Sequence, residues 1–532
     1  MGLRDTNVSR LATEEYDVLI VGGGINGAVS AAALAARGAR VALIDARDFA
    51  GFTSQQSSNL VWGGIKYMEG YEFGLVSGLC KSRNELLDSF PSTVKEIRFL
   101  MTLNRQFRFH PWVILASTWL YWLLGRAKTL TPRLLSLRQI NETEPLIDIS
   151  ASSAGIEYSD AFLHDNDARF VFNFVRSAMD KGCAAANYVE SKGANRDALG
   201  HWKTAVKDQI SGKSFTIRSK ILINAAGAYV DHHNQLSGIV TRHHHLLSKG
   251  IHLIVPKISE NHRVLAFFAN DERLFFAIPM ANRTCIGTTD TRVHNPQTEV
   301  TDEDRDFVLT NINARLNLPT PLGREDVIAE RCGVRPLAAL KSSGNSLDVK
   351  HVSRKHVIET TDNRNHISIF GGKLTDCLNV GNEICDQIAQ LGIDLQPAGK
   401  WYGEPDAQAR AGFFSRARAL GLDEIVASDT QETLSERLWR RYAANAEAMV
   451  DAIERDASLA EPLIEQAGIR RCEIAYLAQH EMIVKLEDYL RRRSKIELLL
   501  PRETLRQSTG LLQACKILFG DQAQQRIDEY FN

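Results

Sequence analysis

The chain lacks an excess of either charge, a paired-cysteine motif and a leader-like apolar segment. Its 532 residues carry 63 Lys and Arg against 64 Asp and Glu, so nothing favours nucleic acid as a partner. The eight cysteines are scattered without a CxxC pair, which argues against a zinc site or a redox dithiol and suits a reducing cytoplasm. The polar N-terminus has no apolar core of the kind that a signal peptide needs.

Metal-ligand spacing is also missing. Histidines gather at His243-His244-His245 and at His232-His233. Consecutive side chains point in different directions, and no acid or cysteine stands beside them at ligand spacing. We therefore expect no metal.

No uncharged run reaches the roughly 18–20 residues of a membrane span. The nearest approach is residues 111–125, fifteen uncharged residues in which Trp112, Trp119 and Trp122 share one helical face with Leu115 and Leu123. From Ile97 to Asn141 there is no Asp or Glu, but there are seven basic residues: Arg98, Arg105, Arg108, Arg126, Lys128, Arg133 and Arg138. Tryptophan-rich apolar surface flanked by cations is typical of a helix lying in the plane of a membrane. The alternative is a buried helix beside a solvated basic loop.

The strongest positive signal is the segment Tyr16–Asp45, YDVLIVGGGINGAVSAAALAARGARVALID. It predicts a strand, a glycine turn, a helix and a second strand, with Gly22, Gly24 and Gly27 at the GxGxxG positions. These glycines suit a tight turn, close approach to a pyrophosphate and helix–strand packing. Asp45 stands where a carboxylate accepts hydrogen bonds from a ribose hydroxyl. We predict a dinucleotide site in preference to an unliganded turn.

Two later turns decide which dinucleotide is expected. A buried strand ends at Ala225-Ala226-Gly227, and another ends at Gly371-Gly372-Lys373 before a helix. Small residues allow close approach to a ligand, and a helix N-terminus favours the negative charge of a reduced flavin. NAD enzymes need only the first turn. Three turns over about 350 residues favour FAD bound by a discontinuous domain.

The remaining patterns give a domain plan. We expect an α/β fold: a discontinuous FAD-binding Rossmann-like domain, a β-rich substrate domain and a C-terminal all-helical cap domain. The oxidoreductase region would span 14–390, with FAD-binding parts at about 14–80, 150–245 and 350–390. Its substrate and membrane parts would be about 81–149, which looks helical, and 246–349. A linker over Gln396–Pro405 would lead into the cap domain, residues 396–532. There, Arg491-Arg492-Arg493 with Lys495 predicts a solvated helix end, and contact with membrane headgroups is the alternative.

Eight motifs occur in a fixed order: VGGGINGA, TSQQSSNLVWGGIKYMEG, NAAGAYVD, KGIHLIVP, IGTTDTRV, CGVRPL, SRKH and FGGKLT. Together they resemble the FAD-dependent, quinone-linked (aerobic) glycerol-3-phosphate dehydrogenase family. The stretch LAQHEMIVKLEDYLRRRSK resembles the cap domain of that family. The resemblance covers nearly the whole chain, from about Tyr16 to Lys495.

The resemblance implies FAD-dependent oxidation of sn-glycerol 3-phosphate to dihydroxyacetone phosphate. Hydride would pass to flavin N5 and electrons to a membrane quinone. A phosphorylated polyol needs an anion site, a base for its hydroxyl proton and cations near the developing oxyanion. By resemblance these are His252 as base, with Arg335, Lys373, Lys66, Tyr67 and Arg354. The implied FAD-binding residues are Gly22, Gly24, Gly27, Asp45, Ser57, Ser58, Ala226, Gly227, Gly371, Gly372 and Thr375.

The chain departs from the family pattern in one loop. The family reads SSKLIHGGLRYLE where this chain reads SSNLVWGGIKYME, so Asn59 replaces a lysine, Trp62 a histidine and Lys66 an arginine. Lysine at 66 keeps the charge but loses the bidentate fork that suits phosphate. Asp376 follows Thr375 where a neutral residue is common, which adds negative charge near the flavin ring. The flavin scaffold is untouched, whereas the identity of the substrate depends on this loop.

These observations lead to one expectation and two alternatives. We expect a peripheral, monotopic membrane enzyme on the cytoplasmic face of the inner membrane. One alternative is an oxidase that passes electrons from glycerol 3-phosphate, or another small hydroxy or amino acid, to oxygen. The other is a flavin-binding scaffold that has lost turnover, for which the altered loop is the only support. The oligomeric state is left open, with a homodimer among the options.

Overall fold

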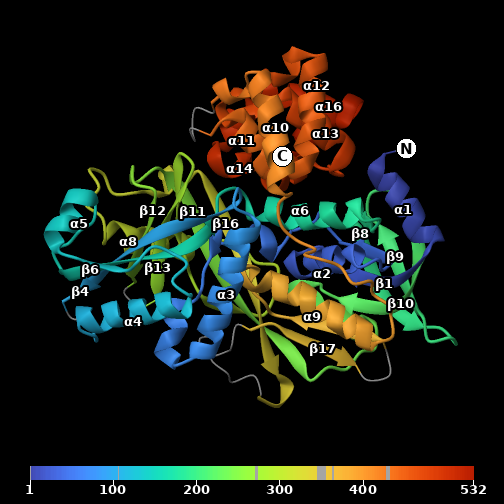
Figure 1. The fold of residues 1–532 in the computed structure, drawn as a ribbon, viewed down its shortest axis with the longest axis horizontal. Helices are drawn as coiled ribbons and strands as arrows, with labels where there is room; N and C mark the ends of the chain where they lie inside the picture. Colours follow the sequence, from blue (N-terminus) through green and yellow to red (C-terminus); the bar gives the residue numbers. More distant parts are fainter. Residues whose placement is uncertain (1, 106, 270–272, 344–354, 362–364, 427–431) are drawn as a thin grey trace.

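Two β-sheets lie side by side beneath a helical domain (Figure 1). The computed structural model describes residues 2–105, 107–269, 273–343, 355–361, 365–426 and 432–532. The α/β architecture expected from the sequence is confirmed.

The first sheet is the Rossmann-like one. Its strands run in the order β17 (Val357–Thr361), β18 (His366–Phe370), β10 (Ser214–Asn224), β1 (Glu15–Val21), β2 (Val41–Ile44) and β7 (Ala184–Ala186), with β9 (Trp202–Asp208) and β8 (Val189–Arg196) extending from β10. The strands from β18 to β7 are parallel. On one face, α2 (Ile25–Ala36) packs between α6 (Asp167–Asp180) and α9 (Cys377–Gln390). The Ala-rich sequence of α2 allows this close packing, because almost all of its residues are buried.

The register of this sheet brings the three small-residue turns together. Val21 pairs with Asn224, and Asn224 pairs with Ser368. Parallel strands end at the same edge, so the turns at 22, 225 and 371 follow three neighbouring strand ends. One sheet is therefore assembled from segments about 350 residues apart, as the FAD hypothesis requires.

The second sheet is antiparallel in most of its pairs. Its strands run in the order β15 (Thr291–Val293), β11 (His243–Pro256), β14 (Arg283–Gly287), β13 (Leu274–Met280), β12 (Arg263–Phe268), β4 (Val94–Asn104), β6 (Ser152–Leu163) and β3 (Leu60–Val61); β16 (Ala329–Leu340) pairs with β11, and β5 (Arg133–Leu135) with β6. One face packs on α8 (Asp302–Asn313) and α5 (Leu137–Thr143). The other face packs on α3 (Phe73–Ser89) and α4 (Pro111–Leu124). This second sheet includes β3 and β6, whose residues the sequence analysis assigned to the FAD-binding part.

The expectation that residues 81–150 are helical is wrong for β4. The charged residues of β4 hide its strand pattern in the sequence. In the structure Arg98 is neutralised by Glu157 of β6, with 2.6 Å between Nη2 and Oε2. Phe99 and Leu100 are then buried on opposite faces of the sheet. A strand covered on both sides shows no clear alternation of apolar and polar residues.

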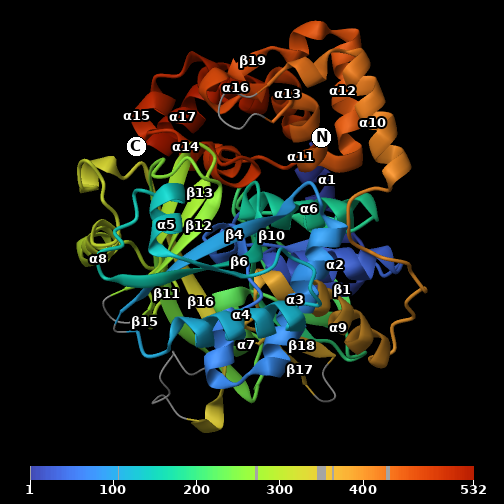
Figure 2. The same ribbon diagram turned by 60° about the vertical axis from the view of Figure 1, so that its left-hand side comes forward.

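The cap domain follows a segment without helix or strand, residues 391–406, where the linker was expected. Its helices are α10 (Ala407–Ala419), α11 (Leu434–Tyr442), α12 (Ala446–Arg455), α13 (Arg471–His480), α14 (Ile496–Leu499), α15 (Arg502–Arg506), α16 (Thr509–Phe519) and α17 (Ala523–Phe531). A short pair, β19 (Pro462–Ile464) with β20 (Ile469–Arg470), means that the domain is helical but not wholly so. Figures 1 and 2 show it resting over α6, at the end of the molecule remote from α4.

The expectation of a solvated Arg491-Arg492-Arg493 is also wrong. All three side chains are buried where the cap domain meets the Rossmann-like sheet. Arg493 Nη1 and Nη2 donate to the Asp48 carboxylate at 2.8 and 2.9 Å, and Arg492 Nε donates to it at 2.8 Å. Burial alone would raise the pKa of Asp48, but the two guanidiniums hold it below its ordinary value. The basic run therefore anchors the cap domain through a buried ion cluster.

Among the described residues, no helix has the length and apolarity that a membrane crossing requires.

Candidate flavin and substrate site

The first glycine turn is sterically closed to side chains. Gly22 has φ +108°, and a Cβ there would overlap the carbonyl of Ala225. A Cβ on Gly27 would overlap the carbonyl of Gly22. The first overlap reflects the contact between neighbouring strand ends, and the second reflects the tight packing of α2 on β1. Both glycines are required for the reasons that the motif predicts.

Asp45 is tied to the same turn. Its Oδ2 accepts from the Gly23 N–H at 2.7 Å, and its Oδ1 accepts from the Arg47 N–H at 2.8 Å. Burial raises the pKa of Asp45 to about 6, against the effect of these two donors. The carboxylate is still mostly ionised at neutral pH. Its contact with a ribose hydroxyl stays a prediction.

The second and third turns lie against the first. Asn26 Nδ2 donates to the Gly371 carbonyl at 3.0 Å, which joins the first turn to the third. Gly371 and Gly372 have φ +64° and +103°, values that favour glycine. Ala226 N–H donates to Asn224 Oδ1 at 3.2 Å, which fixes the second turn at Gly227. The three turns thus form one continuous edge.

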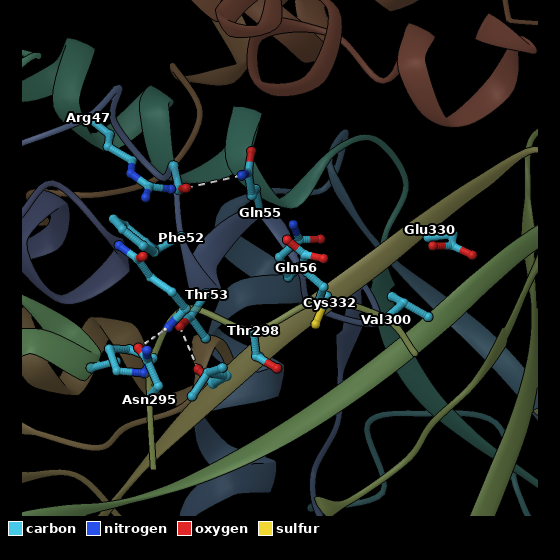
Figure 3. A pocket seen from close by; sticks show the side chains of 16 residues that line it. Arg47, Phe52, Thr53, Gln55, Gln56, Asn295, Thr298, Val300, Glu330 and Cys332 are labelled. Carbon is cyan, nitrogen blue, oxygen red and sulfur yellow. Dashed lines mark hydrogen bonds between the residues drawn. The ribbon is translucent and has the colours of Figure 1, made fainter. Parts of the chain in front are cut away.

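A cavity of about 850 Å³ opens beside this edge (Figure 3). It is lined by residues 51–53, 55–56, 228, 295–300, 330, 332 and 334. Ser54, within the lining loop, accepts from the Ile25 N–H at 3.0 Å, which places the loop against the N-terminus of α2. The Arg47 guanidinium lies 4.1 Å from the centroid of the Phe52 ring. Arg47 also lines the cavity, whereas residues 22–27, 226–227 and 371–375 do not. The volume is in the range of cofactor sites, and the adjoining helix terminus suits the pyrophosphate of an FAD.

Two of the predicted substrate residues meet across the site. Lys373 Nζ donates to Tyr67 Oη at 2.6 Å and lies 4.0 Å from the centroid of the ring. Thr375 is buried, and its Oγ1 donates to the Trp62 carbonyl at 3.4 Å. Lys66, by contrast, is exposed beside Tyr67. The third turn and the 62–67 loop therefore form one unit.

Arg335 is held by the second sheet. Its Nη2 donates to Thr288 Oγ1 at 3.0 Å, and its Nη1 donates to the Thr289 carbonyl at 3.3 Å. A Cβ on Gly250 would overlap the guanidinium, so glycine makes room for it. The side chain keeps 27% of its surface exposed. It is therefore fixed in place and partly exposed, with its Nη1 3.7 Å from Asp290 Oδ1.

His252 is nearly inaccessible, with 3% of its surface exposed. It pairs with Arg331 across β11 and β16, and neither ring nitrogen has a hydrogen-bond partner among the described residues. Burial, then Arg331 and Arg335, lower its pKa to about 3. This value lies far below the ordinary pKa of histidine, near 6.5. The ring is neutral and keeps a lone pair, so its role as a base stays a prediction.

Comparison with known proteins is consistent with this geometry. Residues 17–372 match the family described as FAD dependent oxidoreductase, and residues 404–525 match the C-terminal domain of alpha-glycerophosphate oxidase. A glycerol-3-phosphate dehydrogenase of Pseudomonas aeruginosa is 32% identical over 92% of this chain and 93% of its own length. The chain belongs to the FAD-dependent glycerol-3-phosphate dehydrogenase family.

Solved structures agree on the fold of this family. The glycerol-3-phosphate dehydrogenase of Bacillus halodurans, complexed with FAD, matches with a TM-score of 0.75 at 23% identity, over 99% of this chain and 97% of that one. The L-alpha-glycerophosphate oxidase of Mycoplasma pneumoniae matches with a TM-score of 0.56 at 17% identity, over 74% of this chain and 99% of that one. Membership of the family makes FAD the cofactor.

The loop that departs from the family pattern is held by partners that the sequence analysis missed. Arg331 Nη1 donates to Asn59 Oδ1 at 2.7 Å and also to the Ser57 carbonyl. The Ser57 N–H and hydroxyl donate to Asp167 Oδ2 at 2.9 and 2.8 Å. Ser58 lies half-buried between them. Strand alternation could have indicated Arg331, because it lies four residues before the candidate Arg335 in one strand and therefore on the same face.

The other departure of the chain from the family is neutralised locally. Asp376 Oδ2 lies 2.8 Å from His356 Nδ1, in a buried pair. Burial opposes a charged His356, but the hydrogen bond and charge of Asp376, with Glu383, raise its pKa. The negative charge that Asp376 was expected to add near the flavin ring therefore has a local partner, and the shift in the pKa of His356 favours its positively charged form. Arg354 lies outside the described residues.

Gly27→Ala should remove the flavin. The added Cβ overlaps the Gly22 carbonyl, so α2 must move from β1 and from the edge that holds FAD. We expect full-length protein that purifies with less than about a tenth of the flavin of wild type, because a shift near 1 Å disrupts close packing. The absorbance ratio at 450 and 280 nm measures it. Gly412→Ala, where a Cβ meets nothing within 4 Å, is the matched control. Normal flavin content in the Gly27 variant would contradict the packing argument.

Acid should destabilise the protein partly through His252. Its folded pKa, about 3, lies below the unfolded value near 6.5, so below pH 6.5 the unfolded chain binds a proton that the folded chain does not. Stability is therefore lost as pH falls from about 6.5 toward 3. Between pH 7 and pH 5 we expect His252→Gln to lose about 2 kcal/mol less than wild type. Denaturant titrations at both pH values measure this, with exposed His232→Gln as control. Equal losses in wild type and the His252 variant would rule out the buried neutral ring.

Proposed function

We propose that this protein oxidises sn-glycerol 3-phosphate to dihydroxyacetone phosphate and passes the electrons to a membrane quinone. The observation that carries the proposal is the pair Lys373–Tyr67 at the third turn, to which Arg335 of the second sheet adds a second fixed cation. The names of the curated relatives, matched over nine-tenths of the chain, support the same substrate.

Each cation has a distinct task in this proposal. Arg335 presents a fork that suits a phosphate bidentately, and Lys373 presents a point charge next to the flavin-facing turn. Tyr67 orients the lysine because its Oη accepts a hydrogen bond from Lys373 Nζ at 2.6 Å. Lys66 is exposed beside Tyr67 and adds a further positive charge. A role of Arg354 in the anion pocket is implied only by the resemblance, because this residue lies outside the described ones. The dianionic substrate is thus held by charge before its hydroxyl reacts.

Proton removal falls to His252. The substrate hydroxyl must lose its proton as the carbon-bound hydrogen leaves with two electrons, and FAD, when bound, accepts that hydride at N5. A neutral imidazole can take the hydroxyl proton. The nearby Arg331 and Arg335 then disfavour the protonated ring. The same cations stabilise the developing oxyanion.

Anaerobic reduction of the flavin tests the proposal. Mixing the holoenzyme with sn-glycerol 3-phosphate should bleach the absorbance near 450 nm and yield dihydroxyacetone phosphate. Bleaching by another hydroxy or amino acid, but not by glycerol 3-phosphate, would mean that the protein is an enzyme with a different substrate. Dithionite bleaching with no response to any substrate would favour the flavin-binding scaffold.

The acceptor is tested separately. With ubiquinone present in air, reduced quinone should match product and peroxide should stay a minor fraction. Stoichiometric peroxide would point to an oxidase, the activity named for the Mycoplasma pneumoniae fold relative.

A membrane surface is the proposed location, and α4 is its contact. Trp112, Trp119 and Leu123 expose 62%, 39% and 60% of their surfaces. Apolar residues that are well exposed on one short helix, flanked by cations, suit the acyl–headgroup boundary. Trp122 differs from the prediction: it is half-buried, and its Nε1 donates to the Thr129 carbonyl at 2.6 Å. The exposure supports the surface helix over the buried alternative.

Trp112→Ser with Trp119→Ser should release the protein from membranes. Losing two indoles from an interfacial face should weaken vesicle binding by at least about tenfold. Sedimentation with vesicles containing anionic lipid measures it, and flavin reduction should be unchanged. Leu199→Ser, at a residue that is 83% exposed on the distant β8–β9 hairpin, is the control. Wild-type binding by the tryptophan variant would leave α4 without this role.

A further inference from the structure

A buried carboxylate lies between α4 and the substrate side of the molecule. Asp160 of β6 has no exposed surface. Its Oδ2 accepts from Tyr121 Oη of α4 at 2.6 Å, and its Oδ1 accepts from Arg83 Nη1 of α3 at 3.1 Å. The Gly63 N–H donates to both oxygens, at 3.1 and 3.3 Å. Three segments that are distant in sequence thus share one carboxylate.

Gly63 is the point where this cluster reaches the site. A Cβ on Gly63 would overlap Tyr121 Oη, so the phenol packs directly on the backbone of the 62–67 loop. Four residues later the same loop carries Tyr67, which accepts from Lys373. The loop is therefore fixed at one end by a buried hydrogen-bond cluster and contacts the substrate cations at the other.

Helix α3 extends the connection to the third turn. Arg83 enters the cluster, and its neighbour Ser82 donates from Oγ to Asp376 Oδ1 at 3.1 Å. Asp376 follows the Gly371–Thr375 turn directly. One helix therefore contacts both the carboxylate that holds the loop and the turn that carries Lys373.

The charges in this cluster balance without a ligand. Asp160 is paired with Arg83, and the Tyr121 phenol stays protonated because burial and the neighbouring carboxylate raise its pKa. Removing one donor leaves a buried acceptor partly unsatisfied, which is costly. None of the three side chains is accessible to substrate, so they can act only through the backbone of the loop.

We propose that Asp160, Tyr121 and Arg83 are positioning residues that fix the 62–67 loop, and with it Tyr67, for binding of the anionic substrate. The proposal rests on the proposed function, because it assigns the loop to substrate binding. It also links the position of α4 to the position of Tyr67, since one phenol contacts the helix and the loop.

Tyr121→Phe in the full-length holoenzyme is the first test. The ring stays and one donor to Asp160 is lost, so we expect KM for sn-glycerol 3-phosphate to rise about tenfold. The limiting rate of flavin reduction should change by less than about twofold, because the reacting groups are unchanged. Thr118→Val is the matched control: its hydroxyl donates to Leu115 O within α4, so KM should stay at the wild-type value. An unchanged KM in the tyrosine variant, or an equal rise in both, overturns the proposal.

Gly63→Ala adds a test with built-in rescue. The new Cβ overlaps the phenol oxygen most closely and also Cys80 Sγ, so this variant should raise KM by more than about tenfold, and loss of the oxygen should restore only part of the binding. Adding Tyr121→Phe removes that oxygen, and the double variant should bind substrate better than Gly63→Ala alone. Additive losses would mean that the two residues act independently and would contradict the proposal.

Hydrogen exchange separates this proposal from the proposed function. In holoenzyme without substrate, Tyr121→Phe should speed amide exchange in peptides covering 62–67, and Thr118→Val should not. Suppose that exchange is faster in Tyr121→Phe but glycerol 3-phosphate does not reduce the flavin of the wild type. The positioning role would then hold, and the protein would act on a different substrate. Wild-type exchange in the tyrosine variant would overturn the positioning role whatever the substrate.

Discussion

Asp48→Ala is expected to lower the free energy of unfolding by about 3–5 kcal/mol, because it removes the buried carboxylate that both Nη atoms of Arg493 contact. Arg492 loses the same partner but keeps Asp488 and Glu487. Asp48 has no exposed surface and accepts from Arg492, Arg493 and the Asn187 side chain. No water can replace these contacts without opening the interface between the cap domain and the Rossmann-like sheet. We therefore expect the lost stability to appear as weaker docking of the cap domain on the rest of the protein.

Denaturant unfolding and limited proteolysis measure this loss. The Asp48 variant should be cut faster in the linker, residues 391–406, and its cap domain should unfold at lower denaturant concentration. Asp451→Ala is the control, since Asp451 is 53% exposed and pairs with Arg416 in water, where such a pair contributes at most about 1 kcal/mol. Equal effects of the two substitutions would show that the buried cluster does not hold the cap domain.

Arg335→Ala is expected to lower kcat/KM for glycerol 3-phosphate by about 10³-fold or more, the loss of a charged, bidentate contact to a dianion. The guanidinium is fixed by Thr288 and Thr289 and enters the space left by Gly250. Arg335→Lys should recover only part of the activity, because lysine restores the charge but not the fork.

Steady-state kinetics and flavin spectra check the Arg335 variants together. Flavin content should stay normal, which separates substrate binding from folding. Arg324→Ala, which removes an arginine 48% exposed and paired with Asp306, should behave as wild type. Wild-type kcat/KM in Arg335→Ala would remove this residue from the anion site.

The flavin edge could be predicted because its signals are local. Gly22 and Gly371 follow strand ends and Gly27 lies in the first turn of α2, and short motifs specify that geometry without knowledge of distant partners. The same holds for α6, β10 and the strands from β11 to β14, whose apolar patterns are regular. FAD followed from the return of three such turns and is confirmed by the family.

The features that were missed depend on partners far along the chain. Residues 491–493 were interpreted as surface charge, because nothing near them in the sequence indicates pairing with Asp48, more than 400 residues earlier. β4 read as helix because Glu157, which neutralises Arg98, lies on another strand. The low pKa of His252 comes from burial and from two arginines on β16, which residue type alone does not reveal.

The interleaved order of the first sheet has a consequence for synthesis. β1 leaves the ribosome early, but its neighbour β10 follows about 200 residues later, and β18 almost 150 residues after that. Until residue 370 has emerged, β10 lacks β18, one of its three partners, and an unpaired apolar strand edge is prone to association with other chains. Flavin can be captured only when the last turn arrives. We therefore expect cofactor loading to be a late, nearly post-translational event, and chains truncated before residue 370 to depend on chaperones.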